Sequence, residues 1–110
     1  MIEVNGDRLS LYHYLRYNNP HIVVEKSFMP EVARFYGIII KIFFGDHPPP
    51  HFHAVYGEYN ALIGIESLEI IEGDLPNRAQ KLVIEWATLY QKELLDMWNN
   101  QEFSKLPPLK

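Results

Sequence analysis

The chain has 110 residues, of which 47% are hydrophobic and 14% aromatic, and its formal net charge is −4. This length suits one domain with a single core, and the composition excludes an intrinsically disordered protein. The negative charge argues against a protein that coats nucleic acid through overall positive charge. The sequence contains no cysteine, which excludes disulfides, thiolate metal ligands and cysteine nucleophiles.

The chain is expected to be a soluble, cytoplasmic protein that does not enter a membrane. Its first ten residues lack a charged segment followed by an apolar one. No apolar run approaches the roughly 18 residues that a membrane-spanning helix needs.

The first 28 residues are predicted to form an extension ahead of a main domain at residues 29–110. Residues 2–4 and 21–26 favour short strands, and residues 7–16 favour a short helix. The extension is therefore a small α/β unit.

Three to four antiparallel strands are predicted in the main domain. Residues 34–44 are nearly continuously apolar, which is typical of a central strand. Residues 51–56 alternate in polarity, turn at Gly57-Glu58 and return through residues 59–65. Residues 68–71 favour a fourth short strand.

One long amphipathic helix is predicted from about Pro76 to Trp98. Its apolar positions recur at helical spacing: Ala79, Val83, Trp86, Tyr90, Leu94 and Met97. The predicted fold is α+β, with an antiparallel sheet packed against this C-terminal helix.

The segment Asp46-His47-Pro48-Pro49-Pro50-His51-Phe52-His53 is the best candidate for a functional site. It holds three of the five histidines within eight residues. The prolines fix φ and form a stiff turn. His51 and His53 lie two apart on a predicted strand and should project from the same face, with Asp46 and His47 across the turn.

Metal binding is one interpretation of this cluster. Imidazoles and a carboxylate are ligand types that zinc and other divalent transition metals prefer. The candidate ligands are Asp46, His47, His51 and His53. The alternative is structural: the histidines hydrogen-bond the carbonyl groups of the proline turn, and His53 packs against the helix.

Acid–base catalysis is a second interpretation, with RNA as the substrate. A histidine that titrates near neutrality can take a proton from a ribose 2′-hydroxyl, while an arginine holds the phosphate. The candidate catalytic residues are His47, His51, His53, Arg34, Arg78 and Tyr56. The alternative places the arginines in surface ion pairs.

Four segments resemble a bacterial family, the domain of unknown function 4160. They lie between Met29 and about Trp98 and read MPEVARFYGIIIKIFF, DHPPPHFHAVYG, EGDLPNRAQKLVIEWA and ELLDMW. Pro48 departs from the family pattern, where asparagine is more frequent. The extension is a second departure, because many members begin near the position of Met29.

The resemblance implies one component of a toxin–antitoxin-like pair, with a partner protein encoded by an adjacent gene. An aromatic-rich sheet or an amphipathic helix is a suitable surface for such a partner. Partner binding is therefore the favoured prediction, and a histidine-dependent ribonuclease or a metal-binding enzyme is the alternative. RNA and a second copy of the chain are further candidate partners.

Overall fold

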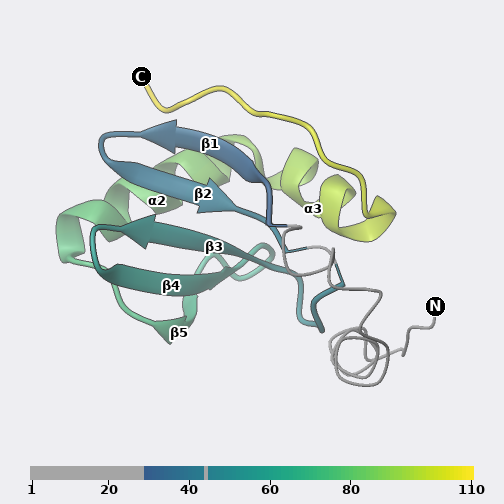
Figure 1. The fold of residues 1–110 in the computed structure, drawn as a ribbon, viewed down its shortest axis with the longest axis horizontal. Helices are drawn as coiled ribbons and strands as arrows, with labels where there is room; N and C mark the ends of the chain where they lie inside the picture. The colour runs from purple at the N-terminus through teal and green to yellow at the C-terminus, as the bar shows by residue number, and fades with distance from the viewer. Residues whose placement is uncertain (1–28, 44) are drawn as a thin grey trace, which may run out of the picture.

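The computed structural model describes residues 29–43 and 45–110. Within these two ranges, five strands precede two helices: β1 (Glu31–Phe35), β2 (Ile38–Lys41), β3 (His51–Tyr56), β4 (Tyr59–Gly64), β5 (Ile70–Gly73), α2 (Asn77–Leu89) and α3 (Gln91–Asn100). The strands form one antiparallel sheet in chain order. Both helices lie on the same side of this sheet (Figure 1).

The α+β class is confirmed, and the predicted strands and helix of residues 1–28 lie outside the described residues. Within the described ranges, no helix combines the length and apolar character needed to cross a membrane.

The prediction of one strand over residues 34–44 is wrong, because the chain reverses at Tyr36-Gly37. Both residues have positive φ, 51° and 81°, as a tight two-residue hairpin turn requires. Glycine adopts this conformation readily, whereas tyrosine does so only at a conformational cost. The turn divides the apolar run into β1 and β2 and raises the number of strands to five.

The prediction of one long helix is also wrong, because α2 and α3 meet at Tyr90. Its φ of −118° and ψ of 22° lie outside the helical range. The Tyr90 ring packs against Trp86, with centroids 5.6 Å apart. The neighbouring Gln91 donates a hydrogen bond to the Ile65 carbonyl at 2.7 Å. The Gln91 hydrogen bond ties the junction to the end of β4, and α3 continues from the junction to cover the end of the sheet where β3 begins (Figure 1).

The core lies between the sheet and the helices. Ile40, Ala54 and Ala61 pair across β2, β3 and β4 and are fully buried. Val83 from α2 and Leu94 from α3 are also fully buried. Removing this apolar surface from water is the main stabilising term for a domain of this size.

Trp86 joins the C-terminal residues to this core. Its indole Nε1 donates a hydrogen bond to the Pro107 carbonyl at 2.8 Å. The Leu106 amide donates to the Val32 carbonyl at 2.9 Å, so the tail runs beside β1 (Figure 1). The tail therefore covers one edge of the sheet.

Trp86→Phe should lower the free energy of unfolding by about 2–3 kcal/mol, because it removes buried volume and leaves the Pro107 carbonyl without its donor. Amide exchange at Leu106 should accelerate, since the tail loses its anchor. Chemical denaturation and hydrogen exchange measure the two effects. Leu89→Ala is the matched control on α2, because Leu89 is 63% exposed and its truncation should change stability by less than about 0.5 kcal/mol. Unchanged exchange at Leu106 would contradict the anchoring role.

Candidate metal centre

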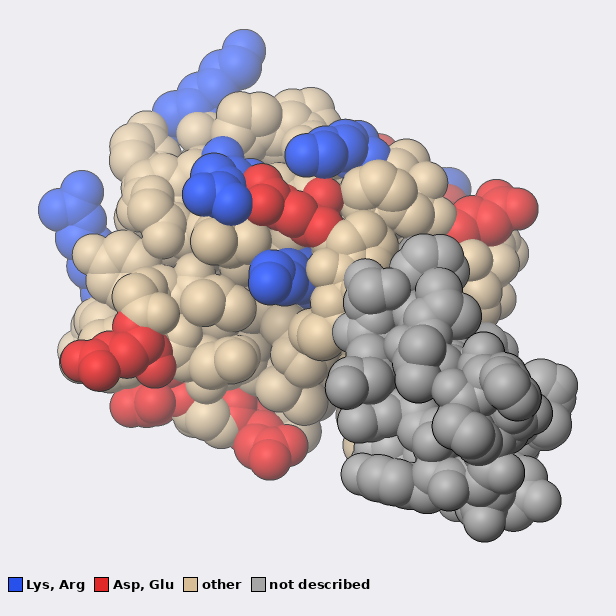
Figure 2. All heavy atoms as spheres, viewed as in Figure 1, with Lys and Arg blue, Asp and Glu red and all other residues tan. Residues whose placement is uncertain are grey.

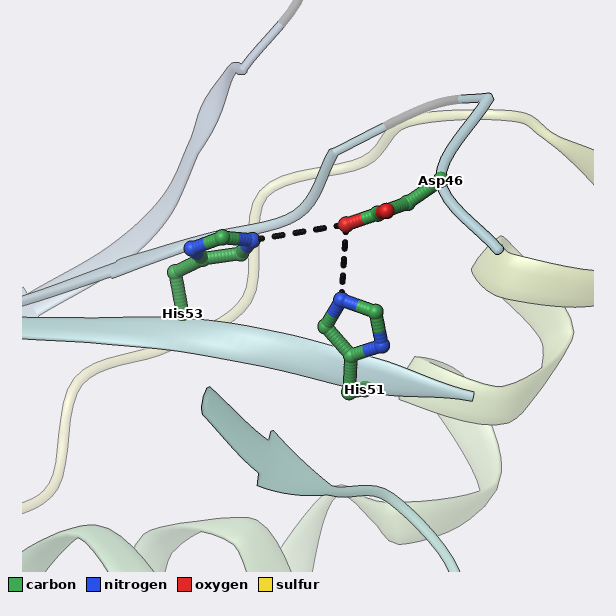
Figure 3. A group of neighbouring side chains, drawn as sticks. All are labelled: Asp46, His51 and His53. Atoms are coloured by element: carbon green, nitrogen blue, oxygen red, sulfur yellow. Dashed lines mark hydrogen bonds and ion pairs between the residues drawn. The ribbon is translucent and has the colours of Figure 1, made fainter. Parts of the chain in front are cut away.

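The proline turn brings Asp46 back over the beginning of β3 (Figure 3). Asp46 is 5% exposed and His51 is 2% exposed, so both polar groups are buried. His51 Nε2 lies 2.7 Å from Asp46 Oδ2, and His53 Nε2 lies 3.6 Å from the same oxygen. One carboxylate oxygen therefore faces both imidazoles, which confirms that His51 and His53 project from the same face of β3.

The second nitrogen of His51 fixes the hydrogen positions of this ring. His51 Nδ1 lies 2.8 Å from the Pro49 carbonyl oxygen, which can only accept. Nδ1 therefore carries a hydrogen and donates it. In a neutral ring, Nε2 would then present a lone pair to the Asp46 carboxylate at 2.7 Å, which is repulsive. A cation must lie between the two atoms, and in the metal-free protein it is a proton on Nε2.

The pKa values of the pair reflect this charge arrangement. Burial raises the pKa of Asp46, but hydrogen bonding with His51 and the contact with His53 outweigh burial and hold it well below its usual range. Burial lowers the pKa of His51, whereas hydrogen bonds to Asp46 and to the Pro49 carbonyl raise it, and the net shift is upward. The metal-free site is therefore a carboxylate paired with an imidazolium.

His53 is the unsatisfied member of the cluster. Its Nε2 is buried and makes no hydrogen bond with any described residue. The 3.6 Å separation from Asp46 Oδ2 is an ion-pair distance and exceeds the normal hydrogen-bond range. Buried polar atoms are rarely left in this state, and an ion is one recognised reason for it.

The structure brings three of the four predicted metal ligands together. One ligand atom each from Asp46, His51 and His53 lies within 4.8 Å of the other two. His47 is placed differently: its Nδ1 lies 3.2 Å from Oδ1, the other oxygen of Asp46, and its backbone amide donates to that oxygen at 2.9 Å. His47 therefore orients the carboxylate from outside the three-atom cluster.

Residues distant in the sequence support the cluster. The Trp98 ring from α3 packs against His51, with centroids 5.0 Å apart. The Gln101 side chain accepts a hydrogen bond from the Gly45 amide at 2.9 Å and donates one to the Trp98 carbonyl at 2.7 Å. No local sequence pattern links either residue to the cluster, because Gln101 lies 56 residues from Gly45 and Trp98 is similarly distant from His51.

The predicted arginines and tyrosine do not join the histidines. Arg34 forms an exposed ion pair with Glu31 at 2.7 Å, as the surface-pair alternative expected. Arg78 and Tyr56 line a separate cavity beside the start of α2. Tyr56 is three residues from His53, about 10 Å along the strand, and points to the opposite face.

Other side chains, not singled out in the sequence, surround His53 instead. Lys41 and Leu62 are its register partners on β2 and β4, and Glu72 on β5 pairs with Leu62. Register partners share a face, so Lys41 and Leu62 flank His53 across the sheet, and Glu72 lies one strand beyond Leu62. His53, Leu62 and Glu72 also line a shallow surface cavity of about 280 Å³. This cavity gives the His53 side of the cluster an approach from solvent.

The fold and the site together define a small α+β protein with a buried cluster of two histidines and one carboxylate. The chain belongs to the family described as domain of unknown function (DUF4160), whose model matches residues 37–99. The family resemblance carried by the sequence motifs is thus confirmed, and the matched range contains Asp46, His51 and His53. No curated protein and no solved structure matches the chain.

Proposed function

We propose that the chain binds a divalent transition metal through Asp46, His51 and His53. The observation that carries this proposal is the buried His53 Nε2, which makes no hydrogen bond with any residue that the structure describes and faces the Asp46 oxygen that also contacts His51. A metal ion there would satisfy this nitrogen and would replace the proton on His51 Nε2. The Nδ1 donation to the Pro49 carbonyl is the usual outer-shell contact of a histidine ligand.

The distances suit this assignment after small side-chain movements. Ligand atoms around a tetrahedral metal with bonds of about 2.0–2.1 Å lie about 3.3 Å apart. The two separations from Asp46 Oδ2, 2.7 and 3.6 Å, fall on either side of that value. Binding would move His51 slightly away from the carboxylate and draw His53 inward.

The ligand set favours zinc, with iron, cobalt and nickel as chemically related alternatives. Three protein ligands leave at least one position for water or a substrate atom, which is the arrangement of catalytic rather than structural sites. The cavity beside His53 is the natural approach to that position. A metal-bound water at this position would be activated for hydrolysis.

A metal titration of untagged, chelator-treated protein tests the proposal. We expect one equivalent of Zn²⁺ to bind and to raise the thermal midpoint, and Co²⁺ to give the visible absorption of a low-coordinate site. Binding of less than about a tenth of an equivalent would overturn the proposal. Competition with Mg²⁺ is the control, since Mg²⁺ prefers oxygen ligands and should not displace zinc.

Gln101→Ala should weaken zinc binding by roughly 10-fold, because the side chain that holds Gly45 beside the proline turn is lost. Competition with a fluorescent chelator measures the change. Gln80→Ala is the control, since it truncates a glutamine on α2 outside the centre and should leave zinc affinity unaltered. An equal loss in both variants would show that Gln101 does not position the centre.

We further propose that the chain binds a partner protein as one component of a toxin–antitoxin-like pair. The observation that favours this proposal is that the two edge strands of the sheet differ in how far they are covered. The tail covers β1 through the Leu106–Val32 hydrogen bond, whereas β5 is the other edge of the sheet formed by residues 29–43 and 45–110 and exposes 47% of Ile71. An open edge strand can pair with a strand of another chain.

Co-purification with the product of the adjacent gene tests partner binding. Ile71→Lys should reduce capture by at least about 10-fold, since a lysine on an edge strand opposes pairing. Leu89→Lys adds the same charge at an exposed helical position and should have little effect. A stable homodimer disrupted by Ile71→Lys would instead identify β5 as a self-association surface.

A further inference from the structure

A second cavity lies at the opposite end of β3 from the histidines. It has a volume of about 230 Å³ and lies where the β1–β2 turn and the end of β3 meet the start of α2. Ile38 and Ala79 form its buried apolar floor. Tyr36 and Tyr56 line it while remaining 56% and 37% exposed. The cavity therefore offers two accessible aromatic rings above an apolar base.

The conformation of Tyr36 indicates a role other than stability. Its φ of 51° lies in the left-handed region, which a large side chain occupies only at a conformational cost. Asparagine or glycine would form the same turn without that cost. Local strain of this kind concentrates at functional sites. Beside it, a Cβ on Gly37 would lie 3.3 Å from the Tyr56 ring, so the glycine lets this ring rest against the turn.

Arg78 adds a positive charge to the cavity. It is exposed and, among the described residues, forms no ion pair, unlike Arg34 with Glu31 and Lys92 with Asp96. The charges on the sheet face of the molecule are mixed, with Lys and Arg mainly over β1 and β2 and Asp and Glu toward β4 and β5 (Figure 2). A guanidinium beside two tyrosines that forms no ion pair within the described part of the chain is available to an external anion.

We propose that this cavity binds a nucleoside monophosphate, with the base between Tyr36 and Tyr56 and the phosphate on Arg78. A volume of about 230 Å³ corresponds to roughly eight water molecules, which is enough for one nucleobase. The sugar and phosphate then extend to the exposed rim. Base stacking on aromatic rings and a bidentate guanidinium–phosphate contact are the chemistry that recognises such a ligand.

A single nucleotide fits better than a strand of nucleic acid. The net charge of −4 repels an extended polyanion, and the cavity holds one base only. The site is independent of the metal proposal, because Tyr56 lies about 10 Å from His53 along β3 and on the other face.

Titration by NMR and calorimetry with uridine and adenosine 5′-monophosphates tests the proposal on the full chain. Uridine alone, inorganic phosphate alone and a ten-nucleotide single-stranded RNA are the comparison ligands. We expect both monophosphates to bind, with shifts confined to the cavity, and to bind more tightly than uridine or phosphate.

Two variants separate the aromatic and ionic parts. Tyr36→Asn should weaken monophosphate binding by roughly 5- to 100-fold while preserving or raising the thermal midpoint, because it removes the stacking ring and relieves the turn. Arg78→Gln should weaken monophosphate binding by roughly 10-fold or more and leave uridine binding unchanged. Lys81→Gln removes a nearby positive charge outside the cavity and should have a small effect.

Three results would overturn the proposal. The first is the absence of saturable monophosphate binding. The second is an equal loss in Arg78→Gln and Lys81→Gln, which would indicate general electrostatic attraction. The third is much tighter binding of the RNA than of the monophosphates, which would replace the nucleotide with a strand.

Discussion

His53→Ala should weaken zinc binding by roughly 100-fold or more and leave the metal-free protein nearly as stable as before. The loss of affinity should exceed that from removing an outer-shell contact, because a ligand atom itself is lost. The small effect on the metal-free protein follows from its contacts: His53 Nε2 makes no hydrogen bond within the described part of the chain. The free energy of unfolding without metal should fall by about 1 kcal/mol or less.

His47→Ala is the matched control for this prediction. It removes an imidazole from the same turn, but His47 contacts Oδ1 of Asp46 and lies outside the three-atom cluster. Zinc affinity should therefore fall far less than in His53→Ala. Calorimetric zinc titration and chemical denaturation with a chelator measure the two quantities. Equal zinc affinity in His53→Ala and the natural chain would remove His53 from the centre.

Above about pH 6, the free energy of unfolding should change with pH in opposite directions in the metal-free and zinc-loaded protein. In the metal-free protein the raised pKa of His51 contributes stability that is complete below its ordinary value of 6.5 and is lost as pH rises through the raised value. The lowered pKa of Asp46 contributes stability that is complete above 3.8 and is lost as pH falls. The metal-free protein should therefore be most stable between about pH 4 and 6.5.

Bound zinc should reverse the change of the free energy of unfolding with pH above about pH 6. The metal takes the place of the His51 proton, so binding releases a proton and strengthens as pH rises. Between about pH 6 and 8.5 the zinc-loaded protein should gain stability while the metal-free protein loses it. Denaturation at both pH values, with zinc and with a chelator, measures the difference. Parallel profiles would contradict the exchange of proton for metal.

The sequence predicts the site well where its members are close together in the chain. Asp46, His51 and His53 fall within eight residues, and period-two alternation is enough to place the two histidines on one face. The Gly57-Glu58 turn was predicted for the same reason, since alternating segments flank it and β3 pairs with β4 across it. Local patterns of this kind do not depend on the rest of the fold.

The sequence fails where tertiary contacts decide the conformation. Tyr36-Gly37 does not read as a turn, because tyrosine rarely has positive φ and the surrounding run is apolar. The helix break at Tyr90 is not marked by a proline or glycine, and the long-range contact at the break is the hydrogen bond from Gln91 to the Ile65 carbonyl. Hydrophobic periodicity cannot reveal a contact between residues so far apart in the sequence.

Tertiary structure also separates Arg78 from the histidines. Residue type alone groups Arg78 with the histidines as a phosphate-binding residue. In the fold, Arg78 lies at the start of α2, which is at the opposite end of β3 from His51. The side chains that do flank His53 are Lys41 on β2 and Leu62 on β4, with Glu72 on β5 one strand further, and strand register brings them together. Register is a property of the whole sheet and is not visible in any one segment.

Anomalous diffraction from crystals grown with zinc tests the central claim most directly. We expect one peak at the absorption edge, about 2.0–2.2 Å from Asp46 Oδ2, His51 Nε2 and His53 Nε2. His51 should remain bonded to the Pro49 carbonyl through Nδ1, because that contact leaves Nε2 free for the metal. Crystals that contain zinc elsewhere but show no peak at this cluster, with His51 Nε2 still 2.7 Å from Asp46, would contradict the metal centre.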